Sequence, residues 1–335
     1  MNRLQRYFGA GLAVGLSLTA VPASAADKIR ILFPTWSGYA PVFVADDLGY
    51  FKSMGLEIEA KFEDERPNVM AAMARGDIEM DMRTVGEYQG KPRDANTPGV
   101  IIGTIDESLG GDGVIGAGDV KSVADLKGKT LAVETNIPAR LLIQLELKKS
   151  KMSLADLKIK EIATADTVSV FADSSIAAVA TYEPFLSQAL KNDTARKPHI
   201  LVSSKDYPGT IVDVIIVRGD DLKANPEKYR KFMIGVFKAI EYFKAKPDDF
   251  IKLAAPHFKL SPADFKASID GSLVYTDYKQ TAEFFGKPGA PGSLYKIFDT
   301  VMELNLENGA ADHKLVATSS MTSSVMSTIS AGDIK

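Results

Sequence analysis

Short apolar runs alternate with longer amphipathic stretches over the first two thirds of the chain. The apolar runs are rich in β-branched residues and predict strands at 29–33, 56–62, 78–82, 99–105, 130–134, 157–162, 176–181, 199–203 and 210–217. Helical spacing between them predicts helices at 41–54, 67–75, 136–149 and 184–190. Strands that alternate with helices are typical of α/β proteins with largely parallel sheets.

The last third of the chain has an almost wholly helical pattern. It predicts helices at 226–244, 247–257, 262–270, 279–285 and 293–306. Asn225 and Ser261 each stand directly before a proline, which places a capping residue ahead of the first helical position. In the Ser/Thr-rich tail, Met321, Val325 and Ile329 recur at a spacing of four, so we expect a docked amphipathic helix there.

The first 25 residues have the pattern of a secretory signal peptide. Arg3 and Arg6 precede an uncharged stretch at 8–21, and Ala23-Ser24-Ala25 supplies the small residues of a cleavage site. The uncharged stretch is shorter than the roughly 20 residues that a spanning helix needs. We therefore expect cleavage before Ala26 and a mature protein in the periplasm.

Composition narrows the classes of function. The chain has 335 residues, 40 basic and 43 acidic side chains, three histidines and no cysteine. The lack of a basic excess argues against a nucleic-acid partner. Zero cysteine excludes disulfides, thiolate nucleophiles and Cys-ligated metals, and the histidines show no metal-ligand spacing. We expect a monomer with no cofactor and no metal.

Known catalytic and cofactor motifs give no positive signal. Residues 111–116 match GxGxxG after a strand, but a break at 127–129 removes the long helix that a dinucleotide site needs. No GxSxG or Walker A motif occurs, and no histidine lies near an acid in a way that suggests a relay. The sequence therefore favours a binding protein over an enzyme.

Polar and aromatic residues gather where predicted strands end. In open α/β sheets, ligands bind beyond the carboxyl ends of strands, where loops and helix N-termini supply donors. The segments that follow strands in this way are 35–41, which holds the only tryptophan, 83–87, 106–112, 135–138 and 182–184; Asp213 lies within the strand at 210–217. Their recurrence at successive strand ends indicates one ligand site.

Several segments, in order, resemble the solute-binding proteins of ABC importers for nitrate, sulfonates, taurine and thiamine-precursor pyrimidines. They are Trp36-Ser37-Gly38-Tyr39-Ala40-Pro41, the run 45–51 with 55–58, Ala74-Arg75-Gly76-Asp77-Ile78, the acidic run 106–112, the run 125–133 and Tyr182-Glu183-Pro184-Phe185. Any one segment is weak, but together they cover roughly residues 29–217 and are fairly specific.

The resemblance implies a type II periplasmic-binding-protein fold, with two α/β lobes and a ligand cleft between them. Lobe 1 would comprise residues 26–110 and 218–335, and lobe 2 residues 111–217. The lobes would close on a small-molecule solute and deliver it to a membrane permease, with no bond made or broken. By position, the residues that the resemblance places in the cleft are Trp36, Tyr39, Thr84, Ser108, Asp112, Asn136, Glu183 and Asp213.

The candidate loops are rich in acids, which does not suit a simple anion. An unpaired buried carboxylate is costly, so such acids need a cationic partner or a raised pKa. We expect a zwitterion or amine, taurine-like or sulfonate-like, with its ammonium near Asp112, Glu183 or Asp213 and with Trp36 or Tyr39 packed against it. The alternatives are that these acids are exposed or paired, that the chain is an enzyme related to pyrimidine-precursor synthesis, or that it is a periplasmic sensor.

Overall fold

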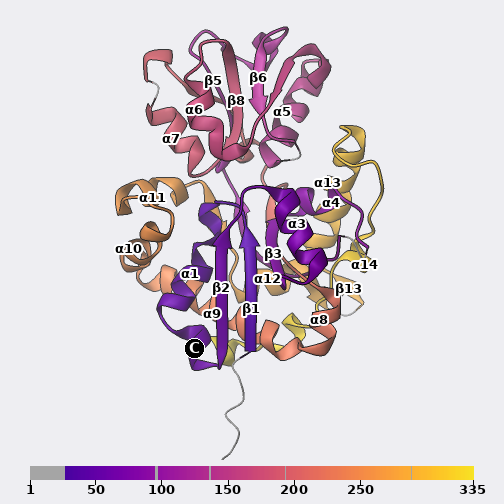
Figure 1. Cartoon of the computed structure of the whole chain (residues 1–335). Coiled ribbons are helices and arrows are strands. Elements are labelled where there is room, and N and C mark those ends of the chain that lie inside the picture. Colours follow the sequence, from indigo (N-terminus) through magenta and orange to yellow (C-terminus); the bar gives the residue numbers. More distant parts are fainter. Residues whose placement is uncertain (1–26, 95–96, 136, 193, 288) are drawn as a thin grey trace, which may run out of the picture.

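The chain folds into two α/β lobes, stacked one above the other in Figure 1. The structure is a computed structural model that describes residues 27–335 except 95–96, 136, 193 and 288; the expected signal peptide and Asn136 thus lie outside the described residues. Lobe 1 holds a six-stranded sheet of order β11-β4-β10-β3-β1-β2. Its strands are β1 (Asp27–Phe33), β2 (Leu56–Phe62), β3 (Met80–Thr84), β4 (Val100–Ser108), β10 (Val212–Val217) and β11 (Leu273–Tyr275).

Lobe 2 holds a five-stranded sheet of order β7-β6-β8-β5-β9. Its strands are β5 (Asp112–Gly116), β6 (Thr130–Val133), β7 (Lys158–Glu161), β8 (Ile176–Tyr182) and β9 (His199–Ser203). A separate hairpin is formed by β12 (Gly286–Lys287) and β13 (Ala290–Pro291). Both main sheets are mixed, since β10 runs antiparallel to β3 and β4, and β5 runs antiparallel to β8 and β9.

Helices flank each sheet. Lobe 1 contains α1 (Ala40–Asp47), α2 (Tyr50–Ser53), α3 (Arg66–Arg75), α4 (Val85–Gln89), α8 (Gly219–Ala224), α9 (Pro226–Ala245), α10 (Pro247–His257), α11 (Pro262–Ile269), α12 (Tyr278–Phe285), α13 (Ser293–Glu307), α14 (Ala317–Ser320) and α15 (Ala331–Ile334). Lobe 2 contains α5 (Pro138–Lys149), α6 (Thr167–Phe171) and α7 (Phe185–Asn192). Among the described residues, no helix has the length and apolar character required to cross a membrane.

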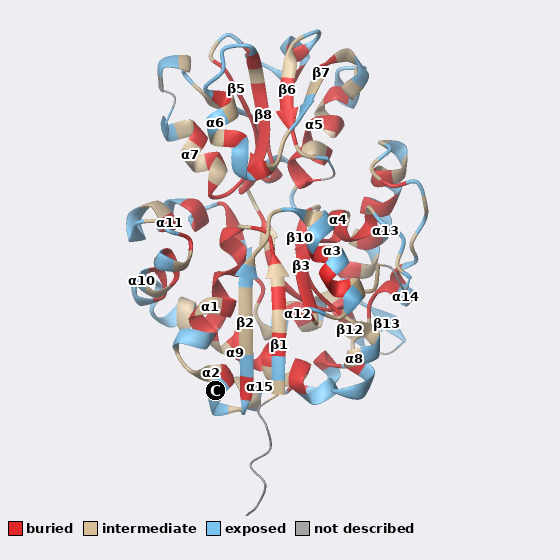
Figure 2. Cartoon of the chain, viewed as in Figure 1, coloured by how far each residue is buried: buried red, intermediate tan, exposed pale blue. Residues whose placement is uncertain are grey.

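Central strands and inward helix faces form the core (Figure 2). Every residue of β10 is buried, as expected for a strand with neighbours on both edges and helices on both faces. In edge-proximal β1, buried Ile29, Ile31 and Phe33 alternate with more exposed residues. The hydrophobic pattern of the sequence thus predicts these strands because it reflects how each one is covered.

Three sequence expectations need correction. The helix expected at 41–54 is divided into α1 and α2, because Gly49 between them adopts a left-handed conformation with φ of 71°. The tail is docked, since Met321, Val325 and Ile329 are buried, but it forms the short α14 and a 3₁₀ turn rather than one helix. The strand at 210–217 was assigned to lobe 2, whereas β10 pairs with β3 and β4 in the sheet of lobe 1.

The two connections between the lobes meet at one serine. One connection joins β4 to β5, and the other runs from β9 through the 3₁₀ turn η6 (Ser204–Asp206) to β10. The Ser204 hydroxyl lies 2.8 Å from Ser108 Oγ and accepts a hydrogen bond from Gly110 N at 2.6 Å. Ser108 N in turn donates to Ile211 O, immediately before β10, at 3.0 Å. We call this group of residues the hinge.

Polar contacts also join the lobes at two edges of their interface. On the side of α7 and α11, Lys191 Nζ lies 2.7 Å from Asp264 Oδ1. On the side of α5 and α13, Lys148 Nζ lies 2.6 Å from Glu307 Oε2. These edge pairs are exposed, so each contributes little free energy on its own.

Candidate functional site

The register of the lobe 1 sheet places four functional side chains in one row. Thr84 of β3 lies opposite Asp213 of β10, Asp213 lies opposite Asp106 of β4, and Asp106 lies opposite Tyr275 of β11. Directly opposed residues in adjacent strands project from the same face of a sheet. Two carboxyl groups, one from each of two neighbouring strands, are thereby held side by side. We call Asp106 and Asp213 the acid pair.

Two aromatic side chains from the segment after β1 hold the acid pair. Tyr39 Oη donates a hydrogen bond to Asp213 Oδ1 at 2.5 Å. Trp36 Nε1 lies 3.2 Å from Asp106 Oδ1 and 3.1 Å from Asp106 Oδ2. Both aromatic residues flank or belong to the 3₁₀ turn η1 (Ser37–Tyr39), and both are buried. The turn after β1 thus supplies one hydrogen-bond donor to each carboxyl group.

A small cavity between the lobes is lined by Thr84 and Asp213 of this row, by other residues of lobe 1 and by residues of lobe 2. Its lining residues are Pro34, Trp36, Tyr39, Thr84, Glu87, Asp112, Pro138, Tyr182 and Asp213. The volume is about 20 Å³, so the side chains are closed around it. The Trp36 and Tyr182 rings meet edge to face, with centroids 6.0 Å apart, which links an aromatic group of each lobe at the cavity wall. We call this space the acidic cavity.

Burial raises the pKa of the carboxyl groups at the acidic cavity. It raises the pKa of Asp106 to about 8, the Trp36 hydrogen bond opposes this, and the nearby Asp112 adds to it. Burial raises the pKa of Asp112 to about 7, against a hydrogen bond from Ser108. Burial and the charge of Asp106 together hold the pKa of Asp213 well above its usual range. Because like charges this close cannot all ionise, the acid pair retains a proton near neutral pH.

Glu87 differs from the other acids because it is paired. Its Oε2 accepts hydrogen bonds from Thr84 N and Thr84 Oγ1, at 3.1 and 2.9 Å, and forms the capping box of α4. Its Oε1 lies 3.2 Å from Arg83 Nη1. Arg83 also lies 3.4 Å from Asp81 through Nε and Oδ2, and all three side chains are buried. The positive charge of Arg83 is therefore already balanced by two carboxylates.

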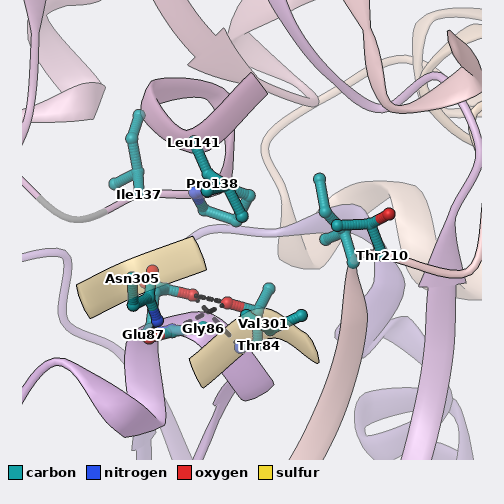
Figure 3. A pocket seen from close by; sticks show the side chains of 10 residues that line it. Thr84, Gly86, Glu87, Ile137, Pro138, Leu141, Thr210, Val301 and Asn305 are labelled. Carbon is teal, nitrogen blue, oxygen red and sulfur yellow. Dashed lines mark hydrogen bonds between the residues drawn. The ribbon is translucent and has the colours of Figure 1, made fainter. Parts of the chain in front are cut away.

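A second, smaller pocket adjoins the acidic cavity (Figure 3). Its volume is about 10 Å³, and Thr84, Glu87 and Pro138 line both spaces. In Figure 3, Ile137 and Leu141 at the start of α5 face the Thr84–Glu87 pair across a gap. The wall that lobe 2 contributes here is apolar. No group of acids and histidines in the described part of the chain has the arrangement of a metal site.

Comparison with known proteins identifies the family. The family described as NMT1/THI5 like matches residues 36–250, which is more than half of the chain. The chain belongs to the NMT1/THI5-like family.

This NMT1/THI5-like protein is similar in sequence to one group of proteins and in fold to several solved structures. A Brucella abortus (strain 2308) protein, provisionally named a binding protein, is 25% identical over 260 residues, which cover 76% of this chain and 80% of the relative. The alkanesulfonate-binding protein SsuA from Xanthomonas axonopodis pv. citri, bound to MOPS, has a TM-score of 0.72 and 16% identity and covers 90% of this chain and 99% of its own. The periplasmic nitrate-binding protein NrtA from Synechocystis PCC 6803 has a TM-score of 0.71 and 12% identity, with coverage of 92% and 91%. The periplasmic-binding-protein fold expected from the sequence is confirmed.

The structure brings together most of the residues that the sequence nominated for the site. Those that line the acidic cavity are Trp36, Tyr39, Thr84, Asp112 and Asp213. Ser108 lies beside them in the hinge, where its hydroxyl contacts Ser204. Asn136 lies outside the described residues.

Glu183 does not line the acidic cavity in this structure. Its carboxylate instead accepts hydrogen bonds from Ser187 N at 3.2 Å and from Ser187 Oγ at 2.7 Å, in the first turn of α7. Burial raises the pKa of Glu183 to about 7. Glu183 therefore fits a local structural role at the start of a helix.

Three further residues of the site were not predicted from the sequence. Asp106 was counted among the acids of a loop, but β4 continues to Ser108 and places it inside the sheet. Tyr182 lines the cavity from lobe 2. Glu87 accepts hydrogen bonds from both Thr84 and Arg83. A capping pattern of threonine followed three residues later by glutamate was the signal for Glu87.

Gly38→Ala in this NMT1/THI5-like protein is expected to destabilise the fold by about 1–3 kcal/mol through overpacking. A Cβ at Gly38 would lie 2.1 Å from Asp106 Oδ2 and 2.1 Å from Trp36 Nε1, so the bond between them must break or shift. Urea unfolding measures the loss. Gly332→Ala is the matched control, because its Cβ would meet only Ser330 Oγ at 3.6 Å. Equal stability of the two variants would contradict the close packing described here.

Proposed function

We propose that the chain is an extracytoplasmic solute-binding receptor of an ABC importer, and that its solute carries a cationic nitrogen. The observation that supports this most directly is the acidic cavity, where Asp112 and Asp213 line the wall together with Trp36 and Tyr39. Asp106 lies directly behind this wall, opposite Asp213 in the sheet and hydrogen-bonded to Trp36. The solute is a small amine or a taurine-like zwitterion. It is bound without chemical change and delivered to a membrane permease.

Charge at the acidic cavity favours a cation over an anion. Three buried carboxyl groups lack a cationic partner at hydrogen-bonding distance within the described structure, whereas Arg83 is already bound to Asp81 and Glu87. An ammonium group there would pair with carboxylates that are costly to ionise alone. Aromatic faces add a cation–π attraction. A simple anion such as nitrate would face the same carboxyl groups without compensation.

A zwitterion has a second anchor on lobe 2. Helix α5 begins with Pro138, which lines the acidic cavity, and no side chain caps its first turn. The N-terminus of this 12-residue helix carries a partial positive charge. The sulfonate or carboxylate end of a zwitterion fits this position, while its ammonium end contacts the acid pair. The solute then touches both lobes.

Contacts to both lobes are what couple binding to closure. A ligand shifts a conformational equilibrium only by its differential affinity for the two states. Because lobe 1 supplies Asp213, Trp36 and Tyr39 and lobe 2 supplies Asp112, Tyr182 and Pro138, a solute reaches its full set of contacts only when the lobes are together. The closed, monomeric receptor is the form we expect the permease to accept in the periplasm.

A binding screen of residues 26–335 tests the proposal. The panel contains taurine, alkanesulfonates, nitrate, spermidine, amino acids and pyrimidines. Binding of each compound is measured as a shift in the melting temperature of the protein. A solute at about 100 times its Kd adds about 2.7 kcal/mol of stability. We expect hits among amines or zwitterions, and the solute should be recovered unchanged after denaturation. Hits from nitrate or amine-free alkanesulfonates alone would overturn the cationic solute, and a chemically altered product would favour the enzyme alternative.

A further inference from the structure

The acid pair lies at the wall of the acidic cavity, where Asp213 lines the space and Asp106 lies beside Asp213 in the sheet. Asp106 and Asp213 are both almost fully buried, they face each other across β4 and β10, and their carboxyl groups are within hydrogen-bonding reach of one another. Two carboxyl groups in this arrangement share a proton, because two adjacent buried negative charges repel strongly.

No described cationic side chain contacts the acid pair. The groups that act on it are carboxylates and aromatic donors from the surrounding elements: Asp112 of β5, Glu87 of α4, Glu107 of β4, Tyr39 of η1, Trp36 before η1 and Tyr275 of β11. Tyr39 donates a hydrogen bond to Asp213, and Trp36 donates to Asp106. Neither donor carries a formal charge. Only a proton or a bound cation can therefore balance the pair.

We infer that Asp106 and Asp213 select the solute by exchange, with the shared proton leaving as the cationic nitrogen of the solute takes its place. This inference rests on the proposed function. One positive charge enters the acidic cavity and one proton leaves to solvent, so the net charge of the closed site is unchanged. No covalent bond forms or breaks in the solute.

The exchange gives a selection rule. A neutral or anionic solute of similar size cannot displace the proton, so it gains neither the ion pairs nor the cation–π contacts. For a cation, binding releases a proton, and the apparent Kd must fall as the pH rises toward the titration of the pair, by up to about tenfold per pH unit. Above that pH the acid pair is already ionised and the dependence disappears.

Trp36 reports the titration without any ligand. It is the only tryptophan of the chain, and its indole N–H points at Asp106. In the ligand-free protein we expect an emission change centred at about pH 8, the pKa of Asp106. Asp106→Asn keeps an oxygen acceptor but cannot ionise, so it should abolish the change. Glu183→Gln, which removes another buried acid outside the cavity, should retain it.

Calorimetry in two buffers of different ionisation enthalpy supplies the second test. With spermidine or taurine as the probe, whichever binds in the screen, we expect release of about one proton per amine bound in the wild-type protein and almost none in Asp106→Asn. Circular dichroism confirms that each variant is folded. Amine binding without proton release would overturn the exchange and leave the receptor function intact. Emission of Trp36 that does not change between pH 5 and about 9.5 would also overturn the exchange, even if no amine binds.

Discussion

Asp213→Asn is expected to weaken amine binding at least about 30-fold. Removing one carboxylate from a buried ion pair costs about 2–5 kcal/mol, and each 1.4 kcal/mol is a factor of about ten in Kd. Asparagine preserves the shape of the side chain and an acceptor for Tyr39, so the effect isolates the charge. Isothermal titration calorimetry at pH 7.5 to 8 measures it on residues 26–335.

The matched control for Asp213→Asn is Glu183→Gln. Both positions are buried acids with raised pKa, but Glu183 is bound to Ser187 in α7 and does not line the acidic cavity. We expect its Kd to stay within about threefold of the wild-type value, equivalent to less than about 0.7 kcal/mol. An equal Kd for the wild type, Asp213→Asn and Glu183→Gln would contradict a role of the acid pair in binding.

Arg83→Met is expected to destabilise the protein by about 3–5 kcal/mol. Methionine fills similar volume but leaves Asp81 and Glu87 as buried charges without their partner. Burial already raises the pKa of Asp81 to about 6 against the opposing effect of Arg83, and loss of Arg83 raises it further. An acid with a raised folded pKa binds more protons when folded than when unfolded, so the stability of the variant falls as pH rises.

Urea unfolding at pH 5 and pH 8 separates these contributions. The free energy of unfolding of Arg83→Met should fall further below that of the wild type at pH 8 than at pH 5. At pH 8, Asp81 without Arg83 must either ionise while buried or stay protonated at a pH where it would ionise in water. Arg75→Met is the control, because Arg75 and Asp77 form an exposed pair 2.7 Å apart that contributes at most about 1 kcal/mol. A similar small loss in both variants, or a deficit independent of pH, would contradict the role of Arg83 as a buried counter-ion.

Much of the fold could be predicted from the sequence, because the buried faces of strands and helices place apolar residues at a regular spacing along the chain. The run at β10, apolar except for Asp213, and the alternation in β1 each report which faces of the strand are covered. The turn after β1 was also identified, since tryptophan, tyrosine and glycine before a proline are conspicuous at a strand end. Local patterns of this kind depend only on neighbouring residues.

The acid pair could not be predicted because it depends on register between distant strands. Asp106 and Asp213 are opposed only after a shift in register between Asp213 and Val214 that no local pattern encodes. Sheet membership of β10 was wrong for the same reason, since a continuous apolar strand fits the centre of either sheet. Glu183 lies apart from the acidic cavity in this structure because a carboxylate at a strand end can face the cleft or its own helix, and here it is hydrogen-bonded to Ser187 of that helix.

The hinge fixes the order in which the binding surface is assembled. Both chain connections pass through the contacts of Ser108, Gly110, Ser204 and Ile211, so in the proposed closure the rotation of the lobes has its axis there, and displacement grows with distance from it. The acid pair lies two residues from this axis on each strand, whereas the edge pairs of Lys191 and Lys148 lie on peripheral helices. A small opening angle therefore breaks the edge pairs and withdraws Tyr182 while the floor of lobe 1 keeps its geometry. Under the proposed function, an arriving solute first meets a preformed half-site on lobe 1, and lobe 2 completes the enclosure afterwards.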